Sequence, residues 1–255
     1  MSAVMNRVLS SAILAPAGFI LGGLLAWQAL VVGLGIPEYL LPTPLVIVTT
    51  IERSLLVEIS YTAGEALCGF VIASALAFVG AVLFVRFRTI EQGLFPLAIT
   101  LKTTPIVAIA PLLVLWLGTG WWSKVAAAVL ISFFPVLVNT VKGLKAPEAD
   151  FQDLFRTMRA DPAQIFRKLR VPYCLPYFFS ALKISSSLAI VGAIVGEFVG
   201  AEHGLGYLIV ISSAHLETPT VFQAIGAAAT IGIAMFYILE FIERRVVFWA
   251  QVELE

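Results

Sequence analysis

The sequence predicts an all-α membrane protein with six transmembrane helices, on the evidence of its composition, its apolar runs and its charge distribution. Of its 255 residues, 60% are hydrophobic and 13% are charged, and the mean hydropathy is +0.99. A soluble domain carries about 25% charged residues. Six apolar runs approach the roughly 20 residues that a helix needs to cross a bilayer. Lysine and arginine gather on alternate connections between these runs, which is typical of cytoplasmic loops.

The six predicted spans form a single membrane domain over residues 1–255. Their predicted boundaries are 11–33, 62–85, 94–117, 123–143, 177–199 and 221–246. Residues 44–60 are too polar to span, so we expect a short helix outside the membrane there. Val8–Pro37 contains thirty residues without a charge. This is longer than the apolar region of a signal peptide, about 7–15 residues, so we interpret it as a retained span.

The third predicted span contains Pro96, Pro105 and Pro111. Proline removes a backbone donor and kinks a helix. In lipid this is tolerated where neighbouring helices or a cavity satisfy the freed carbonyl. We therefore expect a broken helix that lines a pathway, with packing irregularity as the alternative. The candidate pathway residues here are Lys102, Thr103, Thr104 and Pro105.

Lys102 is an ionisable residue within a predicted span, which makes it a functional candidate. It would attract an anionic substrate in a cavity, or it would extend its amine to the cytoplasmic surface. The sequence leaves these two alternatives open.

The orientation follows from the lysine and arginine bias. One set of connections carries Arg7, Arg86, Arg88, the stretch from Lys142 to Arg170, Arg244 and Arg245. The other set carries Arg53 alone between the spans, together with several glutamates, and Lys124 lies at the head of the fourth span. We therefore expect both termini and the basic loop to be cytoplasmic.

The largest predicted cytoplasmic connection covers residues 145–173 and is typical of two helices. The first, "PEADFQDLFRTM", has acidic residues in its first turn, where they favour the helix dipole. The second, "ADPAQIFRKLR", begins with Asp161 as N-cap and Pro162 at the first helical position.

Each of these two helices has an apolar stripe. The stripes are Leu154, Phe155 and Met158 on the first helix, and Ile165, Phe166 and Leu169 on the second. A stripe rimmed by arginine would lie on an anionic membrane surface or dock into a groove of a partner protein. Composition alone leaves both possibilities open.

This loop, closed by "VPYCLP", resembles the coupling loop of ABC importer permeases. The family motif is Glu-Ala-Ala, three residues, Gly, nine residues, Ile, one residue, Leu-Pro. The corresponding residues here are Asp153, Leu154, Phe155, Arg159, Leu169, Val171 and Pro172. Arg159 therefore stands at the motif glycine, where a left-handed turn costs about 1 kcal/mol more without glycine.

The resemblance extends over about residues 40–247. It includes "KTTPIVAIAPLLVLWLGTG", "FFPVLVNTVKGLK", "FRKLRVPYCLPYFFSALK" and "GEFVGAEHGLGYLI". These blocks resemble permeases for nitrate, taurine, alkanesulfonate, bicarbonate and vitamin precursors. The resemblance implies a type I ABC importer permease in a bacterial inner membrane. It also implies ATPase-coupling residues, namely Asp153, Arg159, Ala160, Asp161, Pro162, Gln164, Ile165, Phe166, Arg167 and Pro172.

The same resemblance implies the partners and the mechanism. Two copies of the chain would form the pathway as a homodimer in the lipid bilayer, and two ABC ATPase subunits would supply the energy. The chain has no G-x-x-x-x-G-K-[ST] motif, so ATP and Mg would lie on the ATPase. We therefore expect a transport subunit that is not an enzyme and binds no cofactor or nucleic acid. A periplasmic binding protein would deliver a small solute for transport by alternating access.

Glu197 closes the fifth predicted span. It would pair across the dimer or contribute to an outer gate, or it would be a solvated helix end. The spacing of His203, His215, Glu202 and Glu217 does not require them to converge, so we predict no metal site. Gly204 and Gly206 are expected to form a tight re-entrant loop before the sixth span.

Two other functions, secondary transport and membrane-embedded catalysis, compete with the importer. A secondary transporter would need carboxylates buried in the spans, whereas Glu65, Glu197 and Glu240 all lie near predicted span ends. A membrane enzyme would need a clustered nucleophile or metal set, which the sequence does not contain. The substrate stays open between a pyrimidine-type or riboflavin-type vitamin precursor and a small oxyanion such as nitrate, sulfonate, taurine or bicarbonate.

Overall fold

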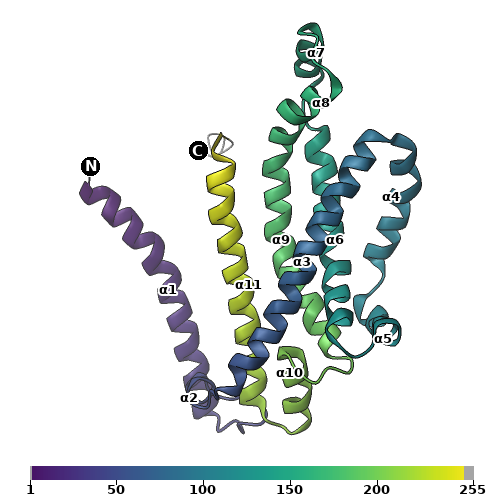
Figure 1. The fold of residues 1–255 in the computed structure, drawn as a ribbon. Helices are drawn as coiled ribbons and strands as arrows, with labels where there is room; N and C mark the ends of the chain where they lie inside the picture. The colour runs from purple at the N-terminus through teal and green to yellow at the C-terminus, as the bar shows by residue number, and fades with distance from the viewer. Residues whose placement is uncertain (1, 250–255) are drawn as a thin grey trace.

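The computed structural model describes the backbone of residues 2–249 and the side chains of residues 16, 18–96, 99–100 and 103–249. All regular secondary structure in these residues is helical, which confirms the all-α prediction (Figure 1). The elements are α1 (Ser2–Gly33), α2 (Pro44–Thr49), α3 (Ser54–Arg86), α4 (Arg88–Thr103), α5 (Ile106–Leu117), α6 (Trp121–Lys145), α7 (Ala149–Thr157), α8 (Pro162–Ile165), the π-helical η1 (Phe166–Arg170), α9 (Val171–Glu197), α10 (Leu205–Ala214) and α11 (Thr218–Val246).

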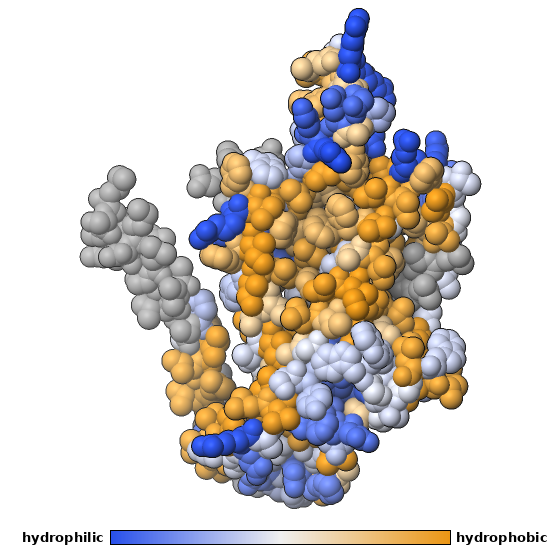
Figure 2. Space-filling view, viewed as in Figure 1, coloured by the Kyte–Doolittle hydropathy of each residue, from blue (hydrophilic) through white to orange (hydrophobic). Residues whose placement is uncertain are grey.

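Four helical segments of the described chain are long and apolar enough to cross a membrane. They are Ser54–Arg86, Trp121–Lys145, Pro162–Glu197 and Thr218–Val246. The remaining apolar helices are shorter: Gly18–Gly33, Ile106–Leu117 and Leu205–Ala214. Figure 2 shows a broad apolar band between two more polar ends of the molecule. This distribution is the one that a bilayer requires of a protein that spans it.

The helices α3, α6 and α9 form the centre of the bundle, and small residues allow their close approach. A Cβ atom at Gly69 of α3 would lie 2.5 Å from the Ala128 Cβ of α6. A Cβ atom at Gly192 of α9 would lie 2.6 Å from the Ala128 Cα. Because α6 is in close contact on both sides, larger residues at these glycines would push the helices apart. Such interfaces between small residues are typical of packed membrane helices.

Polar contacts also join the central helices to each other and to α11. Buried Ser185 of α9 donates a hydrogen bond of 3.0 Å from its hydroxyl to the Ser132 carbonyl of α6. Lys183 of α9 forms an ion pair of 2.6 Å with Glu243 of α11. Ser185 and Lys183 of α9 thus contribute to helix packing.

The third predicted span is divided into α4 and α5, which agrees with the expected break. Helix α4 ends at Thr103, Pro105 is the N-cap of α5, and α5 begins at Ile106. The backbone of Lys102 lies in the last turn of α4, while its side chain lies outside the described residues.

Several helices begin earlier than predicted, among them α1, which begins at Ser2 instead of residue 11. Helix α3 begins at Ser54, eight residues before the predicted start of the second span, so the short outer helix is only α2, Pro44–Thr49. The helix that contains the fifth predicted span begins well before residue 177. Helices α8, η1 and α9 continue one another from Pro162 to Glu197 as one segment of 36 residues. A π-helical stretch directly before Pro172 adjusts the helix path where that proline removes a backbone donor.

The molecule has two distinct ends (Figure 1). At one end, α7 and α8 project beyond the other helices, and the start of α1 and the end of α11 lie on this side. We call it the loop end. At the other end lie α2, α5 and α10, and we call it the α10 end. These two ends contain the candidate functional residues.

Candidate functional site

The turn that follows α7 is left-handed at Arg159, whose φ is +56°. The Arg159 amide donates to the Arg156 carbonyl at 2.9 Å, and the Ala160 amide donates to the Phe155 carbonyl at 3.0 Å. This pair of bonds is a Schellman motif, which satisfies the last carbonyls of a helix and usually uses glycine. The chain therefore keeps the left-handed turn although arginine replaces the motif glycine.

Helix α8 begins with a complete capping box. The Gln164 amide donates to the Asp161 carboxylate at 2.7 Å, and the Asp161 amide donates to the Gln164 side-chain oxygen at 3.1 Å. Pro162 occupies the first turn, where its missing N–H is harmless. The predicted roles of Asp161 and Pro162 are confirmed, and both ends of the turn are fixed by local bonds.

Contacts with the base of α9 hold α7 in place. The Arg170 guanidinium donates to the Gln152 side-chain oxygen at 3.1 Å, and the Gln152 amide group donates to the Pro147 carbonyl at 2.9 Å. The rings of Phe151 and Tyr173 lie 6.2 Å apart. The projecting helices are therefore tied to the long segment that ends at Glu197.

The two apolar stripes of the loop face different surroundings. Leu154 of α7 and Met158, the residue that caps its end, are 54% and 72% exposed. In contrast, Leu169 is buried, and Phe166 packs against the hydrophobic core of the bundle. The first stripe is thus open to a partner, while the second stripe mainly holds the loop to its own chain.

The ten candidate coupling residues also divide into exposed and partly buried side chains. Six are exposed, namely Asp153, Arg159, Asp161, Pro162, Gln164 and Arg167. Four are half-buried, namely Ala160, Ile165, Phe166 and Pro172. The structure brings most of them together around one hairpin, which consists of α7, the turn at Arg159, α8 and η1. The exposed edge of this hairpin carries both charged and apolar groups.

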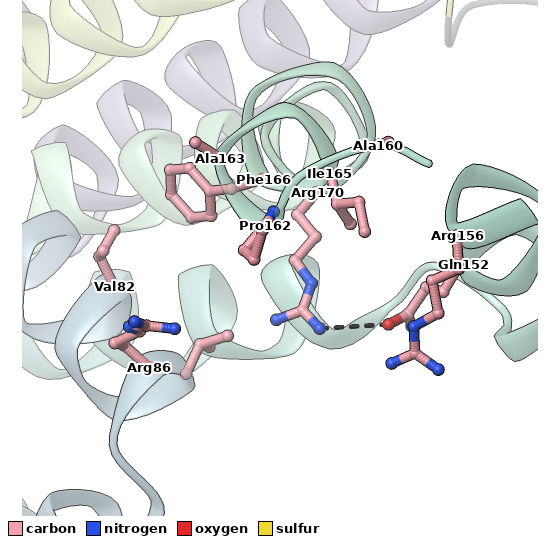
Figure 3. Close-up of a pocket in the computed structure, with 11 residues that line it drawn as sticks. Val82, Arg86, Gln152, Arg156, Ala160, Pro162, Ala163, Ile165, Phe166 and Arg170 are labelled. Carbon is pink, nitrogen blue, oxygen red and sulfur yellow. Dashed lines mark hydrogen bonds between the residues drawn. The ribbon is translucent and has the colours of Figure 1, made fainter. Parts of the chain in front are cut away.

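A hollow of about 700 Å³ lies beside this hairpin. Its walls come from the end of α3, from α7 and from the α8–η1 segment. Figure 3 shows the Arg170 side chain between Arg86 on one side and Gln152 and Arg156 on the other, with the Phe166 ring facing Val82 and Arg86.

At the α10 end, Glu197 is 1% exposed. Its carboxylate accepts hydrogen bonds from the Thr62 hydroxyl of α3 at 2.6 Å and from the Gly206 amide of α10 at 2.5 Å. The Thr62 hydroxyl in turn accepts from the Leu205 amide at 2.7 Å. The alternative of a solvated helix end is therefore wrong, and the partners of Glu197 lie in its own chain.

The glycines before and within α10 allow this close approach. Gly204 has φ +109°, and a side chain there would collide with the Glu197 carboxyl. A Cβ atom at Gly206 would lie 2.6 Å from the Ile194 carbonyl. The predicted re-entrant segment thus brings the first turn of α10 directly against the end of α9.

Sequence reasoning missed several members of this buried cluster. Glu58 accepts a hydrogen bond of 2.5 Å from the Gly204 amide, and Glu65 is 4% exposed. Lys124 is 2% exposed; its amine donates to the Thr119 carbonyl and, at 3.2 Å, to the Gly120 carbonyl. Glu65 and Glu197 lie within electrostatic range of Lys124. We call Glu58, Thr62, Glu65, Lys124 and Glu197 the clamp cluster.

A signal for the clamp cluster was present in the sequence. Glu58, Thr62 and Glu65 are spaced i, i+4 and i+7, which places them on one face of a helix. Because the second span was predicted to begin at residue 62, Glu65 was expected near its end. In fact Glu65 lies about three turns inside α3. The location of Glu65 therefore does not count as evidence against a secondary transporter, contrary to the expectation from sequence.

The candidate pathway residues at the break between α4 and α5 that have described side chains make local contacts. The Thr103 and Thr104 hydroxyls both donate to the Thr100 carbonyl, at 2.9 and 3.0 Å, and Pro105 is exposed at the break between α4 and α5. Within the described residues, no hydrogen bond or ion pair joins this break to Glu197.

His203 stacks on Tyr61 with ring centres 4.5 Å apart, and its Nδ1 lies 3.4 Å from the Glu58 carboxylate. Among the residues with described positions, no group of three or more histidine, cysteine, aspartate or glutamate side chains is arranged to hold a metal ion.

An apolar helical bundle with several helices long enough to cross a bilayer is the architecture of a protein embedded in a membrane. Residues 67–248 match the family model described as "Binding-protein-dependent transport system inner membrane component". The chain belongs to this family, as the resemblance predicted. It is the permease of a binding-protein-dependent ABC importer, a non-catalytic inner-membrane subunit with several membrane-crossing helices.

Curated relatives match most of the chain. It is 35% identical over 240 residues to the formylaminopyrimidine transport permease protein ThiX of Halalkalibacterium halodurans, covering 92% of this chain and 96% of the relative. It is 33% identical to the riboflavin transport system permease protein RibX of Chloroflexus aurantiacus, covering 89% and 86%. It is 29% identical to the putative aliphatic sulfonates transport permease protein SsuC of Bacillus subtilis, covering 88% and 83%.

A solved structure has a similar fold. A chain of the MetNI methionine ABC transporter in an inward-facing conformation superposes with a TM-score of 0.56. The sequence identity is 17%, and the match covers 77% of this chain and 94% of that chain.

Proposed function

We propose that two copies of this chain form a pathway with six crossings each, and that the projecting hairpin of each copy docks into an ABC ATPase subunit. The exposed edge of α7 and α8 supports this proposal because it presents Met158, Gln164 and Arg167 to solvent. Its local caps preserve the hairpin's shape before any partner binds. A preformed helix lowers the entropic cost of docking. The loop end is then cytoplasmic, as the basic residues predict.

One continuous helix carries this proposal. The segment from Pro162 to Glu197 has 36 residues, which corresponds to about 54 Å at the rise of an α-helix. It therefore connects the docking hairpin directly to the clamp cluster. When the ATPase subunits close on ATP and tilt α8, the far end of the same helix moves with it. Rigid-body movement of this kind is a common switching mechanism in proteins.

In this mechanism the clamp cluster controls the outer gate. Glu197 holds the first turn of α10 through the Gly206 amide and holds α3 through Thr62. Tilting of α9 therefore repositions α10 and α3 together. In the same mechanism the break between α4 and α5, with Lys102, Thr103, Thr104 and Pro105, would line the pathway. Opening alternates between the two faces of the membrane.

The transported solute in this proposal is an aromatic nitrogen heterocycle of the vitamin-precursor type. The observation that favours it is the identity to ThiX and RibX, 35% and 33%, compared with 29% to SsuC. A small oxyanion is the second candidate, favoured by the match to SsuC over 88% of this chain. A periplasmic binding protein would deliver either solute.

Uptake measurements distinguish these two solute classes. The chain would be expressed with its ATPase and its binding protein, and uptake of labelled formylaminopyrimidine, riboflavin and an alkanesulfonate would be compared. We expect saturable, ATP-dependent uptake of one heterocycle. Uptake of the sulfonate alone would replace the first candidate with the second.

Cysteine crosslinking tests the docking surface itself. Both native cysteines are shielded, since Cys174 is buried and Cys68 is half-buried. A Gln164→Cys variant should therefore crosslink to the ATPase through the new thiol. A Glu202→Cys variant, exposed near the α10 end, should not. Equal crosslinking from both positions would contradict the proposed docking.

A further inference from the structure

The hollow beside the hairpin combines positive charge with an apolar wall. Its charged lining consists of Arg86 from α3, Arg156 from α7 and Arg170 from η1. None of the described lining residues is acidic. Val82, Val85 and Phe166 supply apolar surface on the same hollow. The end of α3 and the hairpin, which are distant in sequence, thus bring three guanidinium groups to one cavity.

These arginines retain capacity to bind an anion. Within the described chain, Arg86 makes no hydrogen bond or ion pair, and its guanidinium lies 6.0 Å from the centre of the Phe87 ring. Arg170 donates to the neutral side chain of Gln152 at 3.1 Å. Arg156 has an acidic partner, Asp153, at 3.0 Å, but both side chains are well exposed. An exposed pair of this kind contributes little energy, so an incoming phosphate can compete with it.

From the position of Arg86 in the sequence we infer that the hollow lies where the bilayer changes from hydrocarbon to headgroup. Arg86 is the last residue of α3 and directly follows the uncharged run of residues 66–85. Val82 lies one turn deeper in the membrane than Arg86. The arginines therefore meet the headgroup region, while the apolar wall continues toward the hydrocarbon. This gradient from charge to apolar surface matches the gradient along a phospholipid.

We propose that the hollow binds an anionic phospholipid, whose phosphate contacts Arg86, Arg156 and Arg170 and whose upper acyl chain lies along Val82, Val85 and Phe166. Arginine suits this ligand because its fork of donors matches the phosphate oxygens. Basic pockets between helices at the cytoplasmic side of membrane proteins bind lipid headgroups for the same electrostatic reason. The lipid would connect α3 to the hairpin and brace the docking surface. Only this last consequence rests on the proposed function; the binding does not.

A lipid-binding measurement on the full-length chain tests the proposal. The chain would be placed in phosphatidylcholine nanodiscs containing a minor fraction of spin-labelled phosphatidylglycerol, and the protein-bound fraction of the label would be measured. We expect Arg86→Gln to reduce the preference for phosphatidylglycerol over phosphatidylcholine about fivefold. The matched control is Arg88→Gln, since Arg88 is exposed on the same connection but does not line this hollow. The control should keep the preference within about twofold of the unmodified chain.

Three results would overturn the proposal. The first is an equal loss of preference in both variants, which would indicate a general surface charge effect. The second is displacement of the labelled lipid by excess inorganic phosphate, which would make the ligand a soluble anion. The third is an unchanged preference in both Arg86→Gln and Arg156→Gln, which would leave the hollow without a lipid.

The complex with the ATPase separates this inference from the proposed function. If the ATPase copurifies with Arg86→Gln while the lipid preference falls, the lipid site and the docking surface are distinct and both stand. If the ATPase is absent even from the unmodified chain, the docking proposal fails, while the lipid measurement on the chain alone still decides the inference.

Discussion

The loop end and the α10 end of this permease are built in opposite ways. At the loop end, Asp161 and Gln164 cap a short helix through bonds between residues three positions apart. At the α10 end, Glu197 and Thr62 bond across 135 positions, and Thr62 and Leu205 across 143. The loop end is therefore a locally stabilised, exposed element, whereas the α10 end depends on the complete tertiary fold. In the proposed mechanism, the locally stabilised end docks on a partner and the end that depends on tertiary contacts controls the outer gate.

The largest effect should follow from removing the buried lysine of the clamp cluster. Lys124→Met leaves Glu65 and Glu197 without their nearby positive charge, and breaking a buried charge arrangement costs about 3–5 kcal/mol. We expect the apparent Tm in detergent to fall by about 10 °C. Adding Glu65→Gln should restore part of the loss. If the double variant is no more stable than Lys124→Met, the two groups are not coupled and the cluster is wrongly described.

A smaller loss should follow from Glu197→Ala. This change leaves the Gly206 amide and the Thr62 hydroxyl without their buried acceptor, at a cost of about 1–3 kcal/mol. Thermal unfolding should show a lower Tm, and faster hydrogen exchange should appear at Gly206. Glu202→Ala, at an exposed position of the same segment, serves as the control. If the clamp cluster stabilises the fold, Glu197→Ala lowers the Tm and Glu202→Ala does not. Equal Tm values for the two variants would contradict this role.

At the loop end, Asp161→Ala should act locally. Loss of an N-cap costs about 1 kcal/mol, which corresponds to roughly fivefold faster hydrogen exchange at the Gln164 amide. The global Tm should not change, because α8 projects from the bundle. Asp150→Ala, exposed in the first turn of α7, should leave this exchange rate unaltered. A large fall in Tm for Asp161→Ala would show that the two ends are not built differently.

The smallest effect should be a gain in stability from Arg159→Gly. Glycine adopts the left-handed conformation at φ +56° without steric cost, so the turn should gain up to about 1 kcal/mol. Exchange at the Ala160 amide should then slow down. Met158→Gly, at a neighbouring residue with φ −77°, should not produce this protection. Equal protection in both variants would indicate that backbone strain at residue 159 is absent.

The loop end could be predicted from sequence because its signals are local. Asp161, Pro162 and the acidic start of α7 act within one helical turn, so their roles follow from spacing alone. The clamp cluster could not be predicted in the same way. Although Glu58, Thr62 and Glu65 share a helix face, nothing in their spacing specifies Glu197 or Lys124 as neighbours. That information comes only from the packing of α3, α6 and α9.

The helix boundaries show a related limit. The prolines of the third span predicted its break correctly, because Pro105 cannot donate within a continuous helix. The apolar run predicted a fifth span from residue 177, yet the helix runs from Pro162 to Glu197. The π-helical stretch Phe166–Arg170 compensates locally, and such adjustments leave no distinct sequence pattern. This continuity is what connects the two ends of the molecule.

Copurification of the ATPase, followed by its activity in lipid, tests the central claim that the hairpin couples this permease to its ATPase. The chain would be coexpressed with its ATPase and compared with a variant carrying Met158→Ala and Arg167→Ala, two exposed residues of the hairpin. The control would be Arg244→Ala, which removes a basic residue from the last turn of α11, also at the loop end. We predict that the ATPase copurifies with the unmodified chain and the control, and is lost with the double variant. Solute movement by the chain without any bound ATPase would contradict the account.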